Sequence, residues 1–355
     1  MSWKTKIPFI LVFCVLLAAC ESLKYYRQAV NGQLYIFVHR KPIASLLQDS
    51  ETNLVLKARL ESVNRIRAFA ASGLQLPLGS HYSTYLDLER PFVVWNVFAA
   101  PEFSIQPLVW CYPVAGCVSY RGYFNARSAQ DFAADLQEQG NDVYIGGVAA
   151  YSTLGWFSDP VLNTIINRDE YQLAALMFHE LAHQVVYVPG ETEFNESFAT
   201  TVEREGLQLW LQADGSEPAA KAQLAINIKE DLARQEQFIA LVQTAVADLK
   251  ILYEGARTDA DKRLAKQQRI NRLRDDYGAL KNQWQGYDGY DAWFARDLNN
   301  AQLATVVTYN SLVPAFTTML REANGDFSLF YQNAAQLEQL NPAERQQKLQ
   351  MLMTQ

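Results

Sequence analysis

The sequence has no excess of positive charge: 31 Lys and Arg residues stand against 38 Asp and Glu residues, for a formal net charge of −7. A nucleic-acid binder needs a cationic face, so we expect no nucleic-acid partner. The 17 glycines and 12 prolines follow no period, which excludes collagen-like and linker-like chains. Hydrophobic residues make up 49% of the 355 positions. The chain can therefore bury the core of two domains, or of one enzyme-sized body with an inserted lobe.

The N-terminal apolar run at residues 7–19 is too short to span a bilayer comfortably as a helix. Two lysines precede it, which is the pattern of an export signal. The run ends in the sequence LAAC at Cys20, which resembles a bacterial lipobox, where a signal peptidase cuts before the cysteine and lipid is attached to it. We expect residues 1–19 to be a lipoprotein signal peptide and Cys20 to carry the lipid. An ordinary signal peptide with an incidental cysteine is the alternative.

The expected lipid would hold the chain at the envelope of a bacterium without any transmembrane helix. Glu21 follows Cys20 where an aspartate would suggest retention in the inner membrane, so we expect the periplasmic side of the outer membrane. Cys14 belongs to the expected signal peptide, which leaves Cys111 and Cys117. In an oxidising compartment this close pair favours a disulfide. Two buried thiols, or half of a metal site, are the alternatives.

The spacing of apolar residues predicts a mainly helical α+β protein with a small mixed sheet. Residues 82–124 favour short strands and turns, and residues 161–212 favour helix. A short strand at 143–145 leads into Gly146 and Gly147. We expect it to be an edge strand on which an extended peptide can lie, with a simple turn as the alternative.

Residues 216–285 predict two long amphipathic helices joined near Gly255, which make an inserted αα-hairpin. The hairpin is a packing element, a lid, or an arm for a protein partner that the sequence does not identify. We expect an N-terminal helical segment at 20–80 and a core at 81–215. C-terminal helices at 286–355 are expected to pack on that core and to end in a polar tail.

Two of the four histidines stand in one helical turn, in the segment His179-Glu180-Leu181-Ala182-His183. Residues i and i+4 of a helix lie on the same face, so the two imidazoles can grip one ion. This is the HExxH pattern of zinc sites, in which a fourth position stays open for water or substrate. We expect one Zn²⁺ per chain, with Glu180 placed to take a proton from the attacking water.

Glu196 is the expected third ligand, thirteen positions after His183 within the sequence FNESFAT. The first helix is expected to end before Gly190, and Asn195 is expected to cap a second one. Glu196 in the first turn of that helix would face back toward the histidines and complete a His₂Glu site. The alternative third ligands are Glu191, Glu193 and Glu203.

HExxH followed by FNESFA resembles the gluzincin metallopeptidases, and NESFA is similar to the Asn-Glu-Gly-Phe-Ala segment of M1-type aminopeptidases. This sequence departs from those families in two ways. The gap from the second histidine to the glutamate is shorter than in thermolysin-like and M1 enzymes. The M1 segment Gly-x-Met-Glu-Asn, whose glutamate recognises a free amino terminus, has no copy here. The stretches 110–124 and 146–157 look like a bacterial family of lipid-anchored aminopeptidases, over most of the mature chain. The resemblance implies a zincin-like catalytic core and a zinc-dependent peptidase, expected to be an aminopeptidase.

Zinc chemistry then assigns the roles. Glu180 would act as general base and later deliver the proton to the leaving amine. The oxyanion needs a hydrogen-bond donor, in gluzincins often a Tyr or His downstream of the ligands; Tyr309 is the candidate, with Tyr151 and Tyr187 as alternatives. The expected partner is a peptide substrate. Because no residue is assigned to the substrate's α-amine, an endopeptidase is an alternative, and a non-catalytic envelope scaffold that binds through the hairpin is another.

Overall fold

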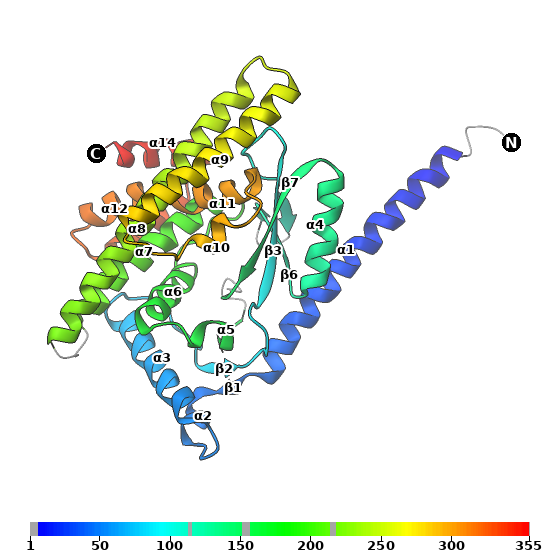
Figure 1. Cartoon of the computed structure of the whole chain (residues 1–355). Coiled ribbons are helices and arrows are strands. Elements are labelled where there is room, and N and C mark those ends of the chain that lie inside the picture. The colour runs from blue at the N-terminus through cyan, green and yellow to red at the C-terminus, as the bar shows by residue number, and fades with distance from the viewer. Residues whose placement is uncertain (1–5, 113–115, 151–156, 214–217, 355) are drawn as a thin grey trace.

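The computed structural model describes residues 6–112, 116–150, 157–213 and 218–354, with side chains outside 6–22 and 218–221. In this part of the chain fourteen helices accompany eight short strands (Figure 1), so the expected mainly helical α+β class is confirmed. The helices are α1 Lys6–His39, α2 Ile43–Gln48, α3 Leu54–Ser72, α4 Ala126–Glu138, α5 Asn163–Ile166, α6 Glu170–Ala182, α7 Thr192–Ala213, α8 Pro218–Glu254, α9 Asp259–Gln283, α10 Asp291–Phe294, α11 Asn300–Asn310, α12 Val313–Glu322, α13 Phe327–Glu338 and α14 Pro342–Met353. The strands are β1 Lys41–Pro42, β2 Thr84–Leu86, β3 Val94–Pro101, β4 Trp110–Tyr112, β5 Gly116–Val118, β6 Arg121–Tyr123, β7 Asn141–Val148 and β8 Val161–Leu162.

The central sheet is antiparallel in the order β6-β3-β7, and all eight residues of β3 pair in register with those of β7. Helix α4 packs on β3 and β7 from one side, and α11 contacts the same two strands. Within the described chain β7 pairs on one side only, which is the edge position expected for the strand at 143–145. The strand is longer than predicted, because Gly146 and Gly147 continue it instead of forming a turn.

The largest apolar cluster surrounds α6 and α7, the helices that carry the HExxH and FNESFA segments. Phe178 of α6 and Phe198 of α7 are fully buried, and Phe198 stacks on Phe330 of α13 with ring centroids 5.4 Å apart. The expected polar C-terminal tail is wrong. Asp326 and Asn341 cap α13 and α14, and α14 packs on α12, so their apolar sides extend this core.

Helices α8 and α9 pack against each other as the predicted hairpin, seen in Figure 1 as the two longest helices of the body. Leu249 and Leu273 are fully buried between them, and Tyr277 of α9 stacks on Phe294 of α10 with centroids 3.9 Å apart. Helix α11 contacts α8, α7, β3 and β7, so it links the hairpin to the sheet and to the FNESFA helix. The division of the chain into domains stays a prediction.

One apolar stretch of the described chain, Asn300–Glu322, has the length and composition of a membrane span. It comprises α11 and α12, and 50% of its most apolar window is buried in the body, as in a core helix. The backbone of α1 runs unbroken from Lys6 to His39, through the expected signal peptide and Cys20. Cleavage and lipidation at Cys20 stay predictions.

Candidate metal centre

Helix α6 presents both histidines to a pocket because its other side is apolar. Leu173, Met177 and Leu181 recur every four residues on that side and are buried, which fixes the rotation of the helix. His183 is the C-cap residue and keeps helical dihedrals (φ −62°, ψ −14°). The i, i+4 relation therefore holds through the end of the helix, and the imidazole centroids of His179 and His183 lie 5.1 Å apart.

Helix α7 brings Glu196 to the histidines, although it begins earlier than expected. The assignment of Asn195 as its N-cap is wrong, because α7 starts at Thr192. The buried side-chain amide of Asn195 instead donates to the carbonyl of Val188 at 2.8 Å, while its oxygen accepts from the Val188 N–H at 2.7 Å. This pair of bonds fastens the loop between α6 and α7, so it holds Glu196 opposite the histidines.

The three expected ligands converge on one point. Oε2 of Glu196 lies 3.3 Å from Nε2 of His179 and 3.8 Å from Nε2 of His183, and the ligand atoms of all three residues lie within 4.8 Å of one another. Zinc bonds of about 2.0–2.1 Å to nitrogen and oxygen place tetrahedral ligands about 3.3–3.4 Å apart. The donor set therefore fits a zinc ion: the separation of His179 from Glu196 already has the required value, and His183 would have to move closer to Glu196.

The three alternative ligands lie elsewhere. Glu191 forms a two-pronged ion pair with Arg345, at 2.8 and 2.9 Å. Glu193 accepts a hydrogen bond from the hydroxyl of Ser311. Glu203 contacts His179 on the ring edge opposite Glu196, with Oε2 3.0 Å from Nδ1. A carboxylate on the second nitrogen of a ligand histidine fixes its tautomer and orientation, so Glu203 is a positioning residue.

We expect Glu203→Gln to weaken zinc binding by about 10–100-fold, since the carboxylate that orients His179 becomes a neutral amide. Competition with a chromogenic chelator measures this affinity directly. Glu205→Gln, two positions along α7, is the matched control and should bind zinc like the unaltered protein. Equal affinities for the two variants would exclude the positioning role.

Burial and neighbouring charges divide the site into neutral and ionised groups. Burial alone would lower the pKa of His179, but Glu196 and Glu203 outweigh it and raise that pKa well above its usual range. Burial lowers the pKa of His183 to about 4, which leaves a neutral imidazole at pH 7. Burial opposes ionisation of Glu196, yet the hydrogen bond from His179 and the nearby histidines hold its pKa below the ordinary value. A divalent cation would take the place of the proton that these carboxylates keep on His179.

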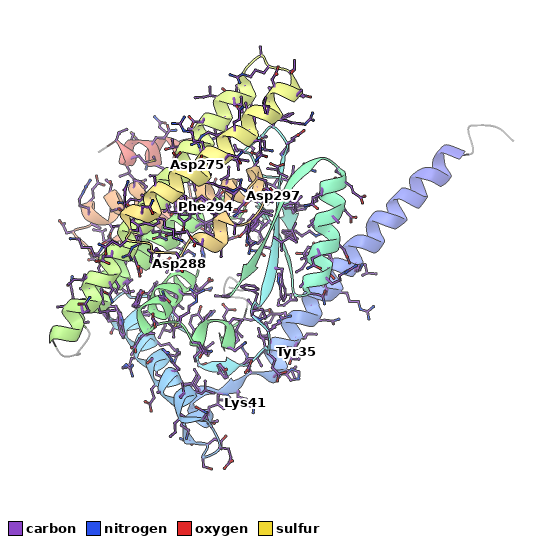
Figure 2. All side chains as sticks on the ribbon, in the orientation of Figure 1. Tyr35, Lys41, Asp275, Asp288, Phe294 and Asp297 are labelled. Carbon is purple, nitrogen blue, oxygen red and sulfur yellow. A yellow bond between two sulfur atoms is a disulfide. The ribbon has the colours of Figure 1, made fainter. Side chains whose placement is uncertain are left out.

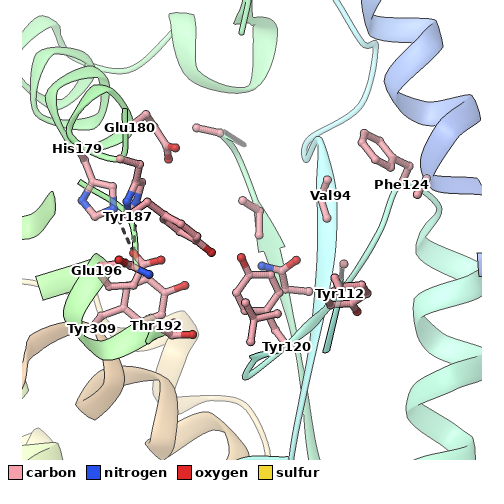
Figure 3. Close-up of a pocket in the computed structure, with 18 of the residues that line it drawn as sticks. Val94, Tyr112, Tyr120, Phe124, His179, Glu180, Tyr187, Thr192, Glu196 and Tyr309 are labelled. Atoms are coloured by element: carbon pink, nitrogen blue, oxygen red, sulfur yellow. Dashed lines mark hydrogen bonds and ion pairs between the residues drawn. The ribbon is translucent and has the colours of Figure 1, made fainter. Parts of the chain in front are cut away.

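The histidines and Glu196 line a cavity of about 410 Å³ together with Glu180 (Figure 3). Burial raises the pKa of Glu180 to about 7; the charge of His179 opposes this rise, and the charges of Glu196, Asp159 and Glu203 add to it. No lysine or arginine lines the described part of the cavity, so nothing there matches a C-terminal carboxylate. The side facing the histidines in Figure 3 carries Val94, Tyr112, Tyr120 and Phe124 and is mainly apolar, and the amide of Asn96 also lines the cavity.

Two of the three candidate oxyanion donors line this cavity. Tyr309 of α11 lies beside Glu196 in Figure 3, and burial, then the charges of Glu196 and Glu180, raise its pKa well above the ordinary value. Tyr187 also lines the cavity, and burial and Glu196 raise its pKa, with no contribution from Glu180. Tyr309 therefore lies close to both the expected ligand and the expected base, as a neutral hydroxyl. Tyr151 lies outside the described residues.

Sequence reasoning missed the groups around Glu180. Asp159, whose charge raises the pKa of Glu180, is buried and lies 3.3 Å from Nδ1 of His81. Tyr82, which follows His81 in sequence, is buried too. Burial raises the pKa of Tyr82, and the charge of Glu180 raises it further. His81 and Asp159 are 78 positions apart, so no local pattern signals this contact.

A disulfide joins Cys111 of β4 to Cys117 of β5 and closes the hairpin that carries Tyr112 and Val118 into the cavity wall. Gly116 of this hairpin has φ +72°, and a Cβ there would lie 2.6 Å from the backbone nitrogen of Gly190. Only glycine fits a left-handed position in such close backbone contact. The hairpin is thereby held against the loop that joins α6 to α7.

These features define a mainly helical α+β protein with a pocket built on two histidines and two glutamates. The chain matches a family model described as "Putative aminopeptidase" over residues 24–349, and it belongs to this family. Membership indicates a peptidase. No curated protein and no solved structure matches the chain.

Proposed function

We propose that the protein is a zinc-dependent aminopeptidase, tethered by lipid on Cys20 to the periplasmic side of a bacterial envelope membrane, favoured to be the outer one. The observation that carries the proposal is the convergence of His179, His183 and Glu196 within 4.8 Å in the wall of a cavity that Glu180 shares. The family match supports peptide hydrolysis. The LAAC sequence at Cys20 supports the tether.

Zinc held by these three residues would polarise the scissile carbonyl and lower the pKa of water. Glu180, whose pKa of about 7 suits proton transfer near neutral pH, accepts the proton of the attacking water and passes it to the leaving amine. Glu203 keeps the ring of His179 in place through Nδ1. The aromatic wall with Tyr112 and Tyr120 receives an uncharged part of the peptide and excludes water from the reacting bond.

Tyr309 donates its hydroxyl hydrogen to the oxyanion, so we expect Tyr309→Phe to lower kcat by about 10²–10³-fold. The ring is kept, so zinc content and folding should not change. Tyr187→Phe is the matched control, because both rings line the cavity and only the hydroxyl is removed. A larger loss in Tyr187→Phe than in Tyr309→Phe would transfer the role to Tyr187.

The exopeptidase assignment is tested with a peptide library whose members have either free or blocked amino termini. Mass spectrometry of the products should show release of single N-terminal residues, and blocking should abolish all cleavage. The endopeptidase alternative has support, because Glu180 and Glu196 are the only carboxylates that line the described cavity and both have other roles. Internal cleavage of blocked peptides would establish it and refute the aminopeptidase.

A further inference from the structure

The outward face of α1 is apolar although it faces solvent. Seven of the eighteen large hydrophobic side chains exposed in the described chain fall between residues 23 and 38. Five of these seven, which we call the outer stripe, recur every three or four positions and are 44% to 71% exposed. They are Leu23, Tyr26, Val30, Leu34 and Phe37. At 3.6 residues per turn they fall within an arc of about 80°, so they form one continuous ridge.

The inner face of the same helix is already packed on the body. Ile36 is 3% exposed, and Oε1 of Gln28 accepts a hydrogen bond from the N–H of Phe124 at 2.9 Å. A Cβ on Gly32 would lie 2.2 Å from the ring of Phe124, which shows how closely the helix approaches the sheet. Because the inner face has its partner, the outer stripe needs a second apolar neighbour.

The charges around the stripe indicate what this neighbour is. No acidic residue occurs from 22 to 48, while Lys24, Arg27, Arg40 and Lys41 fall in this stretch. The segment therefore carries +4, whereas the rest of the chain carries −7 − 4 = −11. An apolar ridge with flanking cations suits an anionic lipid surface. A second copy would bring the same +4 against it and be repelled.

The place of the stripe in the chain favours the same partner. Leu23 follows the expected lipidation site by three residues, so a lipid on Cys20 would bring the start of the stripe to a membrane surface. Figure 1 shows α1 passing along α4 at the side of the body, with its N-terminal half projecting away. Figure 2 labels Tyr35, near the other end of α1, and Lys41, in β1 just beyond that end.

We propose that the outer stripe is a membrane-docking surface that lays residues 23–38 of α1 along an anionic lipid bilayer. Tyr25 and Ala29, on the inner face of the same turns, line the cavity of the metal centre. A helix is about 10–12 Å across, so docking holds the cavity about one helix diameter from the lipid. The surface extends the proposed envelope location and does not depend on the peptidase activity.

The test uses the full chain reconstituted in vesicles of equal parts phosphatidylcholine and phosphatidylglycerol. An environment-sensitive fluorescent amino acid replaces Val30, or, as the matched control, Leu264, which is 61% exposed on α9. We expect a blue shift and quenching by brominated acyl chains at position 30, and neither at 264. Chains that float with the vesicles while position 30 stays water-exposed would overturn docking, and so would failure to float. If the probe at position 30 became shielded from water only as the protein density rose, and bromine did not quench it, the stripe would bind a second copy of the chain and lipid docking would be overturned.

A double substitution adds a second measurement. Val30→Glu with Leu34→Glu places two carboxylates on the stripe, so a probe at Tyr26 should return to its water-exposed emission. Hydrolysis of a short soluble peptide should not change, because neither residue lines the cavity. Leu264→Glu is the control and should leave the probe buried in lipid. An unaltered blue shift in the double variant would refute the role of the stripe.

Discussion

Replacing Glu180 with glutamine is expected to lower kcat for peptide hydrolysis by about 10²–10⁴-fold, the range for loss of a positioned proton acceptor. The three expected zinc ligands stay intact, so zinc content should not fall. Proton transfer belongs to the transition state, so kcat and kcat/KM should fall together with little change in KM. Steady-state kinetics on a peptide that the unaltered protein cleaves, with metal analysis of the same samples, measures both quantities.

The control for this variant lies on the same helix. Glu170 accepts hydrogen bonds from Arg65 and Ser62 at the other end of α6, away from the cavity. Glu170→Gln should therefore keep full activity.

An unchanged protein after Glu180→Gln would be equally informative. A protein that binds zinc, hydrolyses nothing and is unchanged by Glu180→Gln would be a non-catalytic scaffold, with the hairpin at 216–285 as its candidate binding arm.

The parts of the site that lie close together in sequence could be predicted. His179 and His183 share a helix face by the geometry of one turn, whatever the rest of the chain does. Glu196 lies on the next helix, which packs against α6, so a side chain in its early turns can face the histidines. The αα-hairpin could also be predicted, because apolar residues recur at helical spacing over many turns and this spacing depends only on local structure.

The parts that depend on tertiary packing could not be predicted. The sequence offered Glu191 and Glu203 equally as alternative ligands. The structure distinguishes them, because Glu191 pairs with Arg345 whereas Glu203 contacts and positions His179. The true start of α7 depends on the contact of Asn195 with Val188, which replaces the expected cap. The far wall of the cavity joins α1, β3 and the disulfide hairpin, and no periodicity reveals that these segments meet.

Glu196→Gln is expected to produce the second large effect, a loss of zinc affinity of about 100-fold or more. Even the loss of a group that merely orients a ligand costs 10–100-fold, and Glu196 would bind the ion directly. At a zinc concentration of about 100 Kd for the unaltered protein, bound zinc adds about 2.7 kcal/mol to the free energy of unfolding. A 100-fold weaker site would gain only about 0.4 kcal/mol at that concentration. Thermal unfolding with and without zinc measures this difference.

A matched variant keeps the result specific to the ligand. Glu193→Gln lies three positions earlier on α7, where the carboxylate is exposed and accepts from Ser311 instead of facing the histidines. It should retain the full zinc-dependent gain in the free energy of unfolding and the full activity. If Glu196→Gln kept that gain while Glu193→Gln lost it, the third ligand would be misassigned. Because glutamine preserves the size of each side chain, such a result could not be attributed to a cavity in the core.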